Sequence, residues 1–257
     1  MISLWRICFS SMEWKAHIRS FSPRTAVFCA LILATTLTAT NVSGTIQLRD
    51  SKESAVRKKM DFSGVMLWLE PANSKAALPP PVRARMTQKD KTFAPHILAV
   101  PVGATVDFPN FDPIFHNVFS TYDGQIFDLA LYPPGTSKSV TFTRPGIVRV
   151  FCNIHSSMSA VIVVLDTPYF DTTKRDGAFE FRNVPSGEYR LRVFHERATA
   201  ETLDALARRV TVVGDLVSLP TLAISESGYL STPHLNKFGH AYPPPPDDGG
   251  VYPAVRR

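Results

Sequence analysis

The stretch Val150–Val164, "VFCNIHSSMSAVIVV", places a cysteine, a histidine and a methionine three residues apart within strand-like sequence. Alternation along "IVRVFC" puts Cys152 on the face toward which the two preceding core valines point. After a loop that contains His155, "MSAVIVVL" resumes the alternation with Met158 on the inward face. The sequence therefore predicts two strands joined by a loop, with cysteine at the end of one strand and methionine at the start of the next.

A second histidine lies upstream of this loop, in "FPNFDPIFHNVFS". Two strands that end at the same pole of one sandwich would bring His116 beside Cys152. One thiolate, two imidazoles and a weak thioether form a soft ligand set that suits copper in both oxidation states. Zinc accepts cysteine and histidine, but it gains little from methionine and normally takes a fourth N, S or O ligand. A small buried hydrophobe remains the alternative interpretation of Cys152.

Short apolar runs separated by Pro, Gly, Asn and Asp fill residues 61–165, and they predict an antiparallel sandwich. No long stretch keeps the helical period, which argues against a helical bundle. Asp176-Gly177 predicts a tight turn in a second β-module. Alternation in this module predicts two groups that each share one face of a strand: Phe179 with Phe181, and Tyr189 with Leu191 and Val193. Residues 227–257 are rich in proline and glycine, so we expect a tail that is mostly disordered or loosely draped over the protein.

The N-terminal segment, residues 1–44, has basic residues followed by the apolar run Ala26–Ala39, which ends in small residues. This pattern predicts a secretory signal, with an uncleaved anchor as the alternative. Its removal takes away Cys8 and Cys29 and leaves Cys152 as the single cysteine. A lone cysteine in an oxidising compartment is unusual, and metal ligation would protect it. We therefore expect a periplasmic or secreted protein without an integral membrane span after signal removal.

Charge and motifs restrict the function classes. Without residues 1–40, which hold four basic residues and one acidic residue, the net charge falls from +6 to about +3. No aromatic residues are interleaved with the remaining basic residues as in a nucleic-acid site, so we expect no nucleic-acid partner. A phosphate-binding glycine loop, a Ser-His-Asp order and paired catalytic carboxylates are absent from the sequence. The chain is therefore not expected to be an enzyme.

The spacing Cys152-x2-His155-x2-Met158, together with the upstream "N-x-D-P-x-x-H-N-V", resembles the cupredoxins, the small blue copper proteins, with the short ligand loop of the amicyanin type. The resemblance implies one copper ion with His116, Cys152 and His155 as equatorial ligands and Met158 as the axial ligand. It also implies that Asn117 ties the two ligand loops together and forms a hydrogen bond near the copper sulfur.

The segment "DTTKRDGAFEFRNVPSGEYRLRVFHE" resembles the carboxypeptidase regulatory-like module, a small transthyretin-like sandwich without chemistry of its own. The pair of modules is similar to secreted bacterial proteins described as methylamine-utilisation-like. The expected fold is all-β: a cupredoxin Greek-key β-sandwich followed by a small transthyretin-like β-sandwich. The expected organisation is a signal peptide (1–44), a cupredoxin-like domain (45–166), the second module (167–226) and the tail (227–257).

The function implied is that of an exported type 1 copper protein, which transfers single electrons to or from a redox partner protein. His155 would present an imidazole edge to solvent as the electron exit, and Pro113, Ile114 and Phe115 would form an apolar docking rim. Copper binding and delivery with the same ligands is one alternative. A metal-free structural module of the cell envelope is another.

Overall fold

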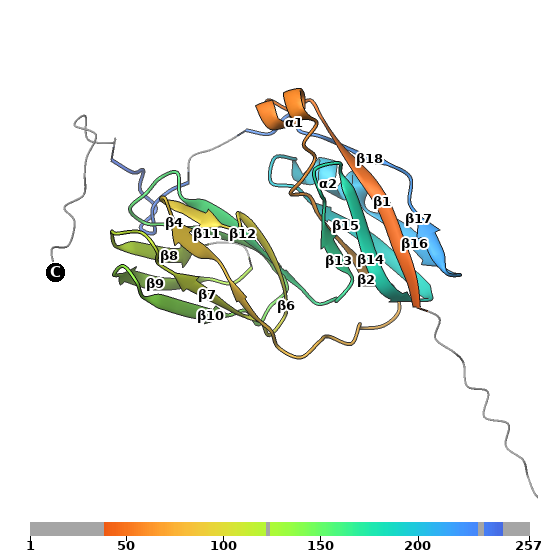
Figure 1. The fold of residues 1–257 in the computed structure, drawn as a ribbon, viewed down its shortest axis with the longest axis horizontal. Helices are drawn as coiled ribbons and strands as arrows, with labels where there is room; N and C mark the ends of the chain where they lie inside the picture. Colours follow the sequence, from red (N-terminus) through yellow and green to blue (C-terminus); the bar gives the residue numbers. More distant parts are fainter. Residues whose placement is uncertain (1–38, 122–123, 231–233, 244–257) are drawn as a thin grey trace, which may run out of the picture. The chain divides into compact units, whose positions relative to one another are not determined.

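The computed structural model describes residues 39–121, 124–230 and 234–243. The expected signal segment therefore lies almost wholly outside the described residues. Strands dominate this part of the chain (Figure 1), and its α-helices are the two short segments α1 (Ser54–Lys59) and α2 (Ala200–Leu206). Within the described ranges, neither helix is long and apolar enough to cross a membrane. The expected all-β class is confirmed.

The first sandwich consists of two sheets from the middle of the chain. The smaller sheet has the order β10 (Ser137–Thr141), β7 (Thr105–Pro109), β3 (Arg83–Arg85). The larger has the order β6 (Ile97–Pro101), β12 (Ser159–Leu165), β11 (Gly146–Phe151), β8 (His116–Ser120), β9 (Phe127–Tyr132). A short hairpin of β4 (Thr87–Lys89) and β5 (Thr92–Ala94) lies beside them. Buried side chains from both sheets form one core, which includes Val106, Phe108, Val118, Val150 and Ile162.

The pairing of β11 with β12 places the two expected ligands inside this core. The strands are antiparallel, with Val150 opposite Ala160 and Phe151 opposite Ser159. Because side chains alternate along each strand, Cys152 follows the inward valines of β11 and Met158 precedes the inward residues of β12. Both side chains are fully buried in the core of the first sandwich. The alternation predicted from the sequence is therefore confirmed at this hairpin.

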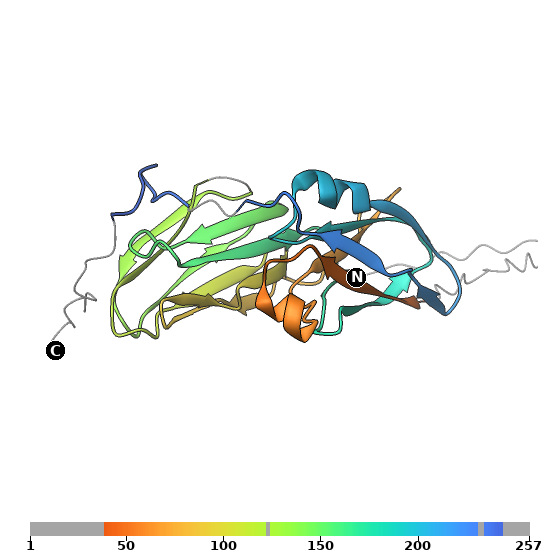
Figure 2. The same cartoon turned by 90° about the horizontal axis from the view of Figure 1, so that it is seen from above.

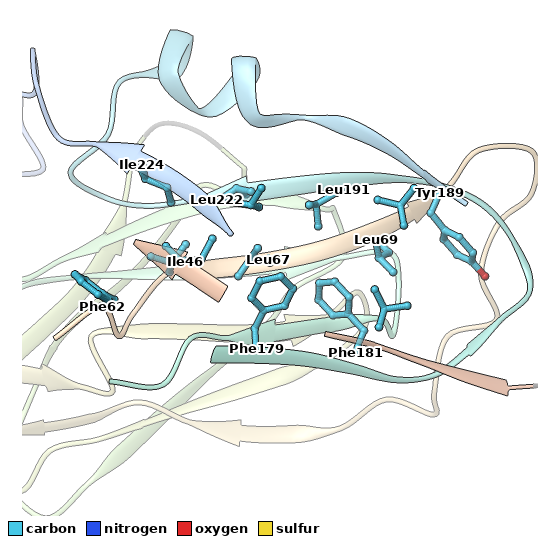
Figure 3. Packing of buried hydrophobic residues seen from close by; sticks show 14 of the residues in the cluster. Ile46, Phe62, Leu67, Leu69, Phe179, Phe181, Tyr189, Leu191, Leu222 and Ile224 are labelled. Atoms are coloured by element: carbon cyan, nitrogen blue, oxygen red, sulfur yellow. The ribbon is translucent and has the colours of Figure 1, made fainter. Parts of the chain in front are cut away.

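The second sandwich combines strands from both ends of the described chain. One sheet has the order β13 (Phe170–Thr172), β2 (Met66–Pro71), β15 (Gly187–Phe194), β16 (Arg208–Val212). The other has the order β14 (Ala178–Pro185), β1 (Ala39–Arg49), β17 (Leu216–Ser218), and β18 (Leu222–Ser225) also pairs with β1. Figure 3 shows the core between them, where Phe179 and Phe181 face Leu69 and Leu191. The shared faces predicted for the second module are confirmed, and the structure shows that both face this core. Seen from above, α1 and α2 lie on opposite sides of these strands (Figure 2).

The strand pairing does not follow the domain boundary expected at residue 45. β1 lies between β14 and β17, and β2 lies between β13 and β15, so residues 39–71 supply central strands of the second sandwich. The first sandwich, residues 83–165, is thus inserted between β2 and β13. The physical reason is burial, since Val42, Ile46 and Leu67 are fully enclosed in the second core. Their partners lie more than a hundred residues further along the chain.

The turn predicted at Asp176-Gly177 is present and requires glycine. Gly177 has φ +80°, and a Cβ there would lie 2.1 Å from the backbone oxygen of Ile46. The Ile46 amide donates a 2.9 Å hydrogen bond to the Gly177 oxygen. The close approach of β1 to this turn thus excludes any side chain.

Candidate metal centre

Three side chains with metal-binding donor atoms converge at one end of the first sandwich. His116 begins β8, Cys152 directly follows β11, and His155 lies in the loop that leads to β12. The Cys152 Sγ atom lies 3.7 Å from His116 Nδ1 and 3.6 Å from His155 Nδ1. The three donor atoms all lie within 4.8 Å of one another, and all three residues are buried. The structure thus brings together the two histidines and the cysteine that the sequence predicted.

The ligand loop, residues 152–158, is closed by its own backbone. The Cys152 amide donates to the Met158 oxygen at 3.0 Å, and the Met158 amide donates to the His155 oxygen at 3.1 Å. Met158 belongs to the same core cluster as Cys152. These bonds hold the cysteine, the histidine and the methionine on one compact turn at the end of the hairpin.

Asp112 is a residue of this site that the sequence reasoning missed. Its Oδ2 atom lies 2.6 Å from His116 Nε2 and accepts the Lys91 amide at 2.9 Å, while Oδ1 accepts the Asp90 amide at 2.6 Å. Burial alone would raise the pKa of this carboxyl, but these hydrogen bonds hold its pKa below the usual value. An ionised carboxylate only accepts hydrogen bonds, so His116 carries its proton on Nε2 and turns the Nδ1 lone pair toward Cys152. The signal available in the sequence was an aspartate four residues before the histidine.

Burial sets the protonation of the three converging groups. It lowers the pKa of His116, and it lowers the pKa of His155 to about 4, so both imidazoles are neutral and able to bind a metal at pH 7. Burial raises the pKa of the Cys152 thiol, although amides of Asn117, Ile154 and His155 that face the sulfur act in the opposite direction. A metal ion that binds here must therefore displace the thiol proton.

Asn117 links three segments around the site. Its Oδ1 accepts the Asn153 amide at 3.3 Å, and its Nδ2 donates to Asp128 Oδ1 at 2.7 Å. The asparagine thereby connects β8 with the ligand loop and with β9. This geometry agrees with the tying role that the cupredoxin resemblance implied.

The residues of the expected docking rim directly precede His116 in the sequence. Pro113 and Phe115 are exposed and Ile114 is half-buried. Phe111, which the sequence reasoning did not include, is also exposed. His155 keeps 8% of its surface exposed, so only a small part of the residue faces solvent. Its role as the electron exit stays a prediction.

Part of the expected disordered tail lies against the ligand loop. Residues 234–243 run beside the loops at the end of the first sandwich that carries the site (Figures 1 and 2). The Tyr242 hydroxyl donates to the Cys152 carbonyl oxygen at 2.6 Å, and the Lys237 amide donates to Asn153 Oδ1 at 2.9 Å. Such contacts depend on individual side chains rather than on a periodic apolar face, so composition did not indicate them.

His195 shows how a buried histidine outside the site is used. It lies in the second sandwich, and its Nε2 atom is 2.9 Å from Glu226 Oε1. Arg197 and Ser51 donate to the same carboxylate. His195 is therefore a packed, hydrogen-bonded histidine of the second sandwich.

Comparison with known proteins yields one curated relative and several solved structures. No family model matches the chain. Over 59 residues it is 42% identical to the methylamine utilization protein MauL of Methylorubrum extorquens, a match that covers 23% of this chain. The chain spans about half the length of that relative, 52%.

The solved structures that resemble the chain include a copper-containing nitrite reductase, a cupredoxin and amicyanin variants. A copper-containing nitrite reductase from Thermus scotoductus is 29% identical, with a TM-score of 0.31 over 37% of this chain and 25% of that one. A purple cupredoxin from Nitrosopumilus maritimus is 22% identical, with a TM-score of 0.29 over 32% of this chain and 99% of that one. A reduced amicyanin variant is 22% identical, with a TM-score of 0.31 over 41% and 100%. Matches with such low TM-scores carry no weight for function.

Proposed function

We propose that this chain is a type 1 copper protein of the cupredoxin class that transfers single electrons. One copper ion would be held by His116, Cys152 and His155 as equatorial ligands and by Met158 as the axial ligand. The observation that carries the proposal is the convergence of two imidazole Nδ1 atoms and one thiol sulfur within 4.8 Å, all buried at one end of a β-sandwich. The cupredoxin-like spacing of these residues in the sequence supports it.

The donor set fits copper better than zinc. Two histidines, one cysteine and a weak thioether suit both oxidation states of copper. Zinc normally takes a fourth strong ligand. The nearby carboxylate of Asp112 is engaged with the outer nitrogen of His116, on the side of the ring away from Cys152. When bound, copper supplies the one-electron redox chemistry.

The protein's own contribution is a set of ligands held in place before metal binds. Asp112 fixes the tautomer of His116, and the two backbone hydrogen bonds within the ligand loop fix Cys152 relative to Met158. Because both oxidation states of copper accept this ligand set, a rigid site minimises the rearrangement that accompanies electron transfer.

The partner would be a redox protein that docks briefly on the apolar rim of Pro113, Ile114 and Phe115, to which Phe111 adds exposed aromatic surface. Aromatic residues are enriched at protein interfaces, and a small rim suits a short-lived encounter. Because the sequence predicts a signal segment, the proposed location of the protein is the periplasm or outside the cell. The second sandwich is proposed to be a transthyretin-like module that carries the copper domain.

Copper binding and delivery with the same ligands is the second candidate. Fast electron self-exchange would support electron transfer. Slow self-exchange with rapid release of Cu(I) to an acceptor would support delivery.

The test is to add Cu(II) to the purified chain and to record its visible absorption and electron paramagnetic resonance spectra beside those of Cys152→Ser. We expect an intense thiolate-to-copper band with narrow hyperfine splitting in the wild type. Cys152→Ser should lose the band, because the charge transfer originates on the sulfur. A Cys152→Ser protein with the same band, or a wild type that ignores copper, would contradict the proposal.

A further inference from the structure

The C-terminal segment 234–242, which we call the strap, contacts the metal centre at several separate points. Tyr242 meets the ligand loop through its hydroxyl, and Lys237 meets it through its backbone amide. The Lys237 side chain forms a 2.8 Å ion pair with Asp128. The ring of His234 stacks on Phe151, with centroids 4.3 Å apart and an angle of 27°. These contacts come from both ends and from the middle of the strap.

The Tyr242 contact reaches the backbone of a proposed ligand. Its hydroxyl lies 2.6 Å from the carbonyl oxygen of Cys152, the first residue after β11 and the first of the ligand loop. The Tyr242 ring also packs edge-on against His234 at 5.1 Å. Through this pair the strap contacts the Phe151 side chain and the Cys152 carbonyl oxygen, which belong to adjacent residues.

Lys237 closes a ring of four residues around the site. Its amide donates to Asn153, the Asn153 amide donates to Asn117, and the Asn117 side chain donates to Asp128. The Asp128 carboxylate then pairs with the Lys237 ammonium. Two of these residues are the direct neighbours of the proposed ligands His116 and Cys152. The strap therefore completes the network that joins the two ligand-bearing segments.

We propose that the strap is a positioning element of the metal centre, in which Lys237 and Tyr242 hold the ligand loop closed and slow the release of metal. The inference rests on the proposed function for the identity of the metal, but the contacts that carry it are those of the polypeptide alone. Opening the loop requires the Cys152 carbonyl and the Asn153 side chain to give up their strap partners. Without the strap, the loop opens more often and the metal leaves faster.

The first test compares the wild type with a double variant, Lys237→Met with Tyr242→Phe, in the full chain. Each protein is loaded with Cu(I), and transfer of the metal to an excess of a chromogenic chelator is timed. Because two hydrogen-bonding side chains are removed, we expect release to be about tenfold faster in the double variant. The single variant Lys237→Arg, which keeps Tyr242 and a positive charge at position 237, should release copper at the wild-type rate. Leu235→Ala is the matched control, since Leu235 is 52% exposed and the substitution keeps its backbone oxygen, which lies 3.2 Å from His234 Nδ1.

The second test is independent of metal. Hydrogen exchange in the metal-free proteins reports on the amides of Cys152, Asn153 and Met158, which all have acceptors in or beside the loop. We expect these amides to exchange faster in the double variant while the amides of β15 keep their protection. Equal loop exchange and equal release rates in the wild type and the double variant would overturn the proposal. A wild type that binds no copper would defeat the proposed function, and hydrogen exchange would still decide whether the strap closes the loop.

Discussion

Replacing Asp112 by asparagine tests how the protein orients His116. The substitution keeps the size of the side chain but turns one carboxylate oxygen into an NH2 donor. Oδ1 accepts the Asp90 amide, and Oδ2 accepts both the Lys91 amide and His116 Nε2. In either orientation of the new side chain, its NH2 group therefore faces at least one N–H donor instead of an acceptor. Only 7% of the aspartate side chain is exposed, so water cannot easily relieve the conflict.

The expected magnitude follows from these contacts. A hydrogen bond to a charged group contributes about 1.5–3 kcal/mol, and a buried donor left without an acceptor adds a penalty of about 1–3 kcal/mol. Loss of an outer partner of a metal-binding histidine typically costs about 10–100-fold in metal affinity. We therefore expect Asp112→Asn to bind copper at least about tenfold more weakly and to lose about 2 kcal/mol of unfolding free energy.

The assay is competition for Cu(I) against a chelator of known affinity, with urea unfolding of the metal-free proteins in parallel. Asp107→Asn is the matched control, because Asp107 lies in the same sandwich but pairs with the exposed Arg83 at 2.6 Å. The control should keep its copper affinity. An Asp112→Asn protein with copper affinity within twofold of the wild type would refute the role assigned to this carboxylate.

Two further predictions concern the second sandwich. Gly177→Ala should lower the unfolding free energy by at least about 2 kcal/mol in urea titrations, because it combines a positive φ with a clash against Ile46. Gly214→Ala, at the same φ of +80° but in open space, should lower the unfolding free energy by about 1 kcal/mol. Equal losses of unfolding free energy in the two variants would contradict the predicted cost of the clash with Ile46. Burial lowers the pKa of His195. Burial alone would raise the pKa of Glu226, but hydrogen bonds from Arg197, Ser51 and His195 outweigh it, so the pKa of Glu226 is below its usual value. The folded chain thus binds fewer protons at both groups than the unfolded chain. The contribution of this pair to stability should therefore be full above pH 6.5 and should decrease as the pH drops through 6.5 and then 4.5. An unfolding free energy that stays constant from pH 7 to 4 would contradict this.

The ligand loop and its inward residues were predictable from the sequence because they depend on short-range rules. Side chains alternate along a strand, so the positions of Cys152 and Met158 relative to the core follow from the apolar pattern alone. The same rule predicted that Phe179 shares a face with Phe181 and Tyr189 with Leu191, and the structure buries both faces in the second core. His116 required one further assumption, that two strands end at the same pole, and the short Sγ to Nδ1 distance confirms that they do.

Other features could be decided only by the tertiary structure. The assignment of β1 and β2 to the second sandwich, the contact of Asp112 with His116 and the strap all depend on which distant segments become neighbours. β1 pairs with β14 more than a hundred residues away, and Tyr242 meets Cys152 across 90 residues. The local sequence pattern predicts which side of a strand faces a core, but it does not predict in which of the two cores the strand lies or with which strand it pairs. The sequence by itself therefore determined the chemistry of the ligand loop, whereas the packing of distant segments decided what surrounds it and holds it in place.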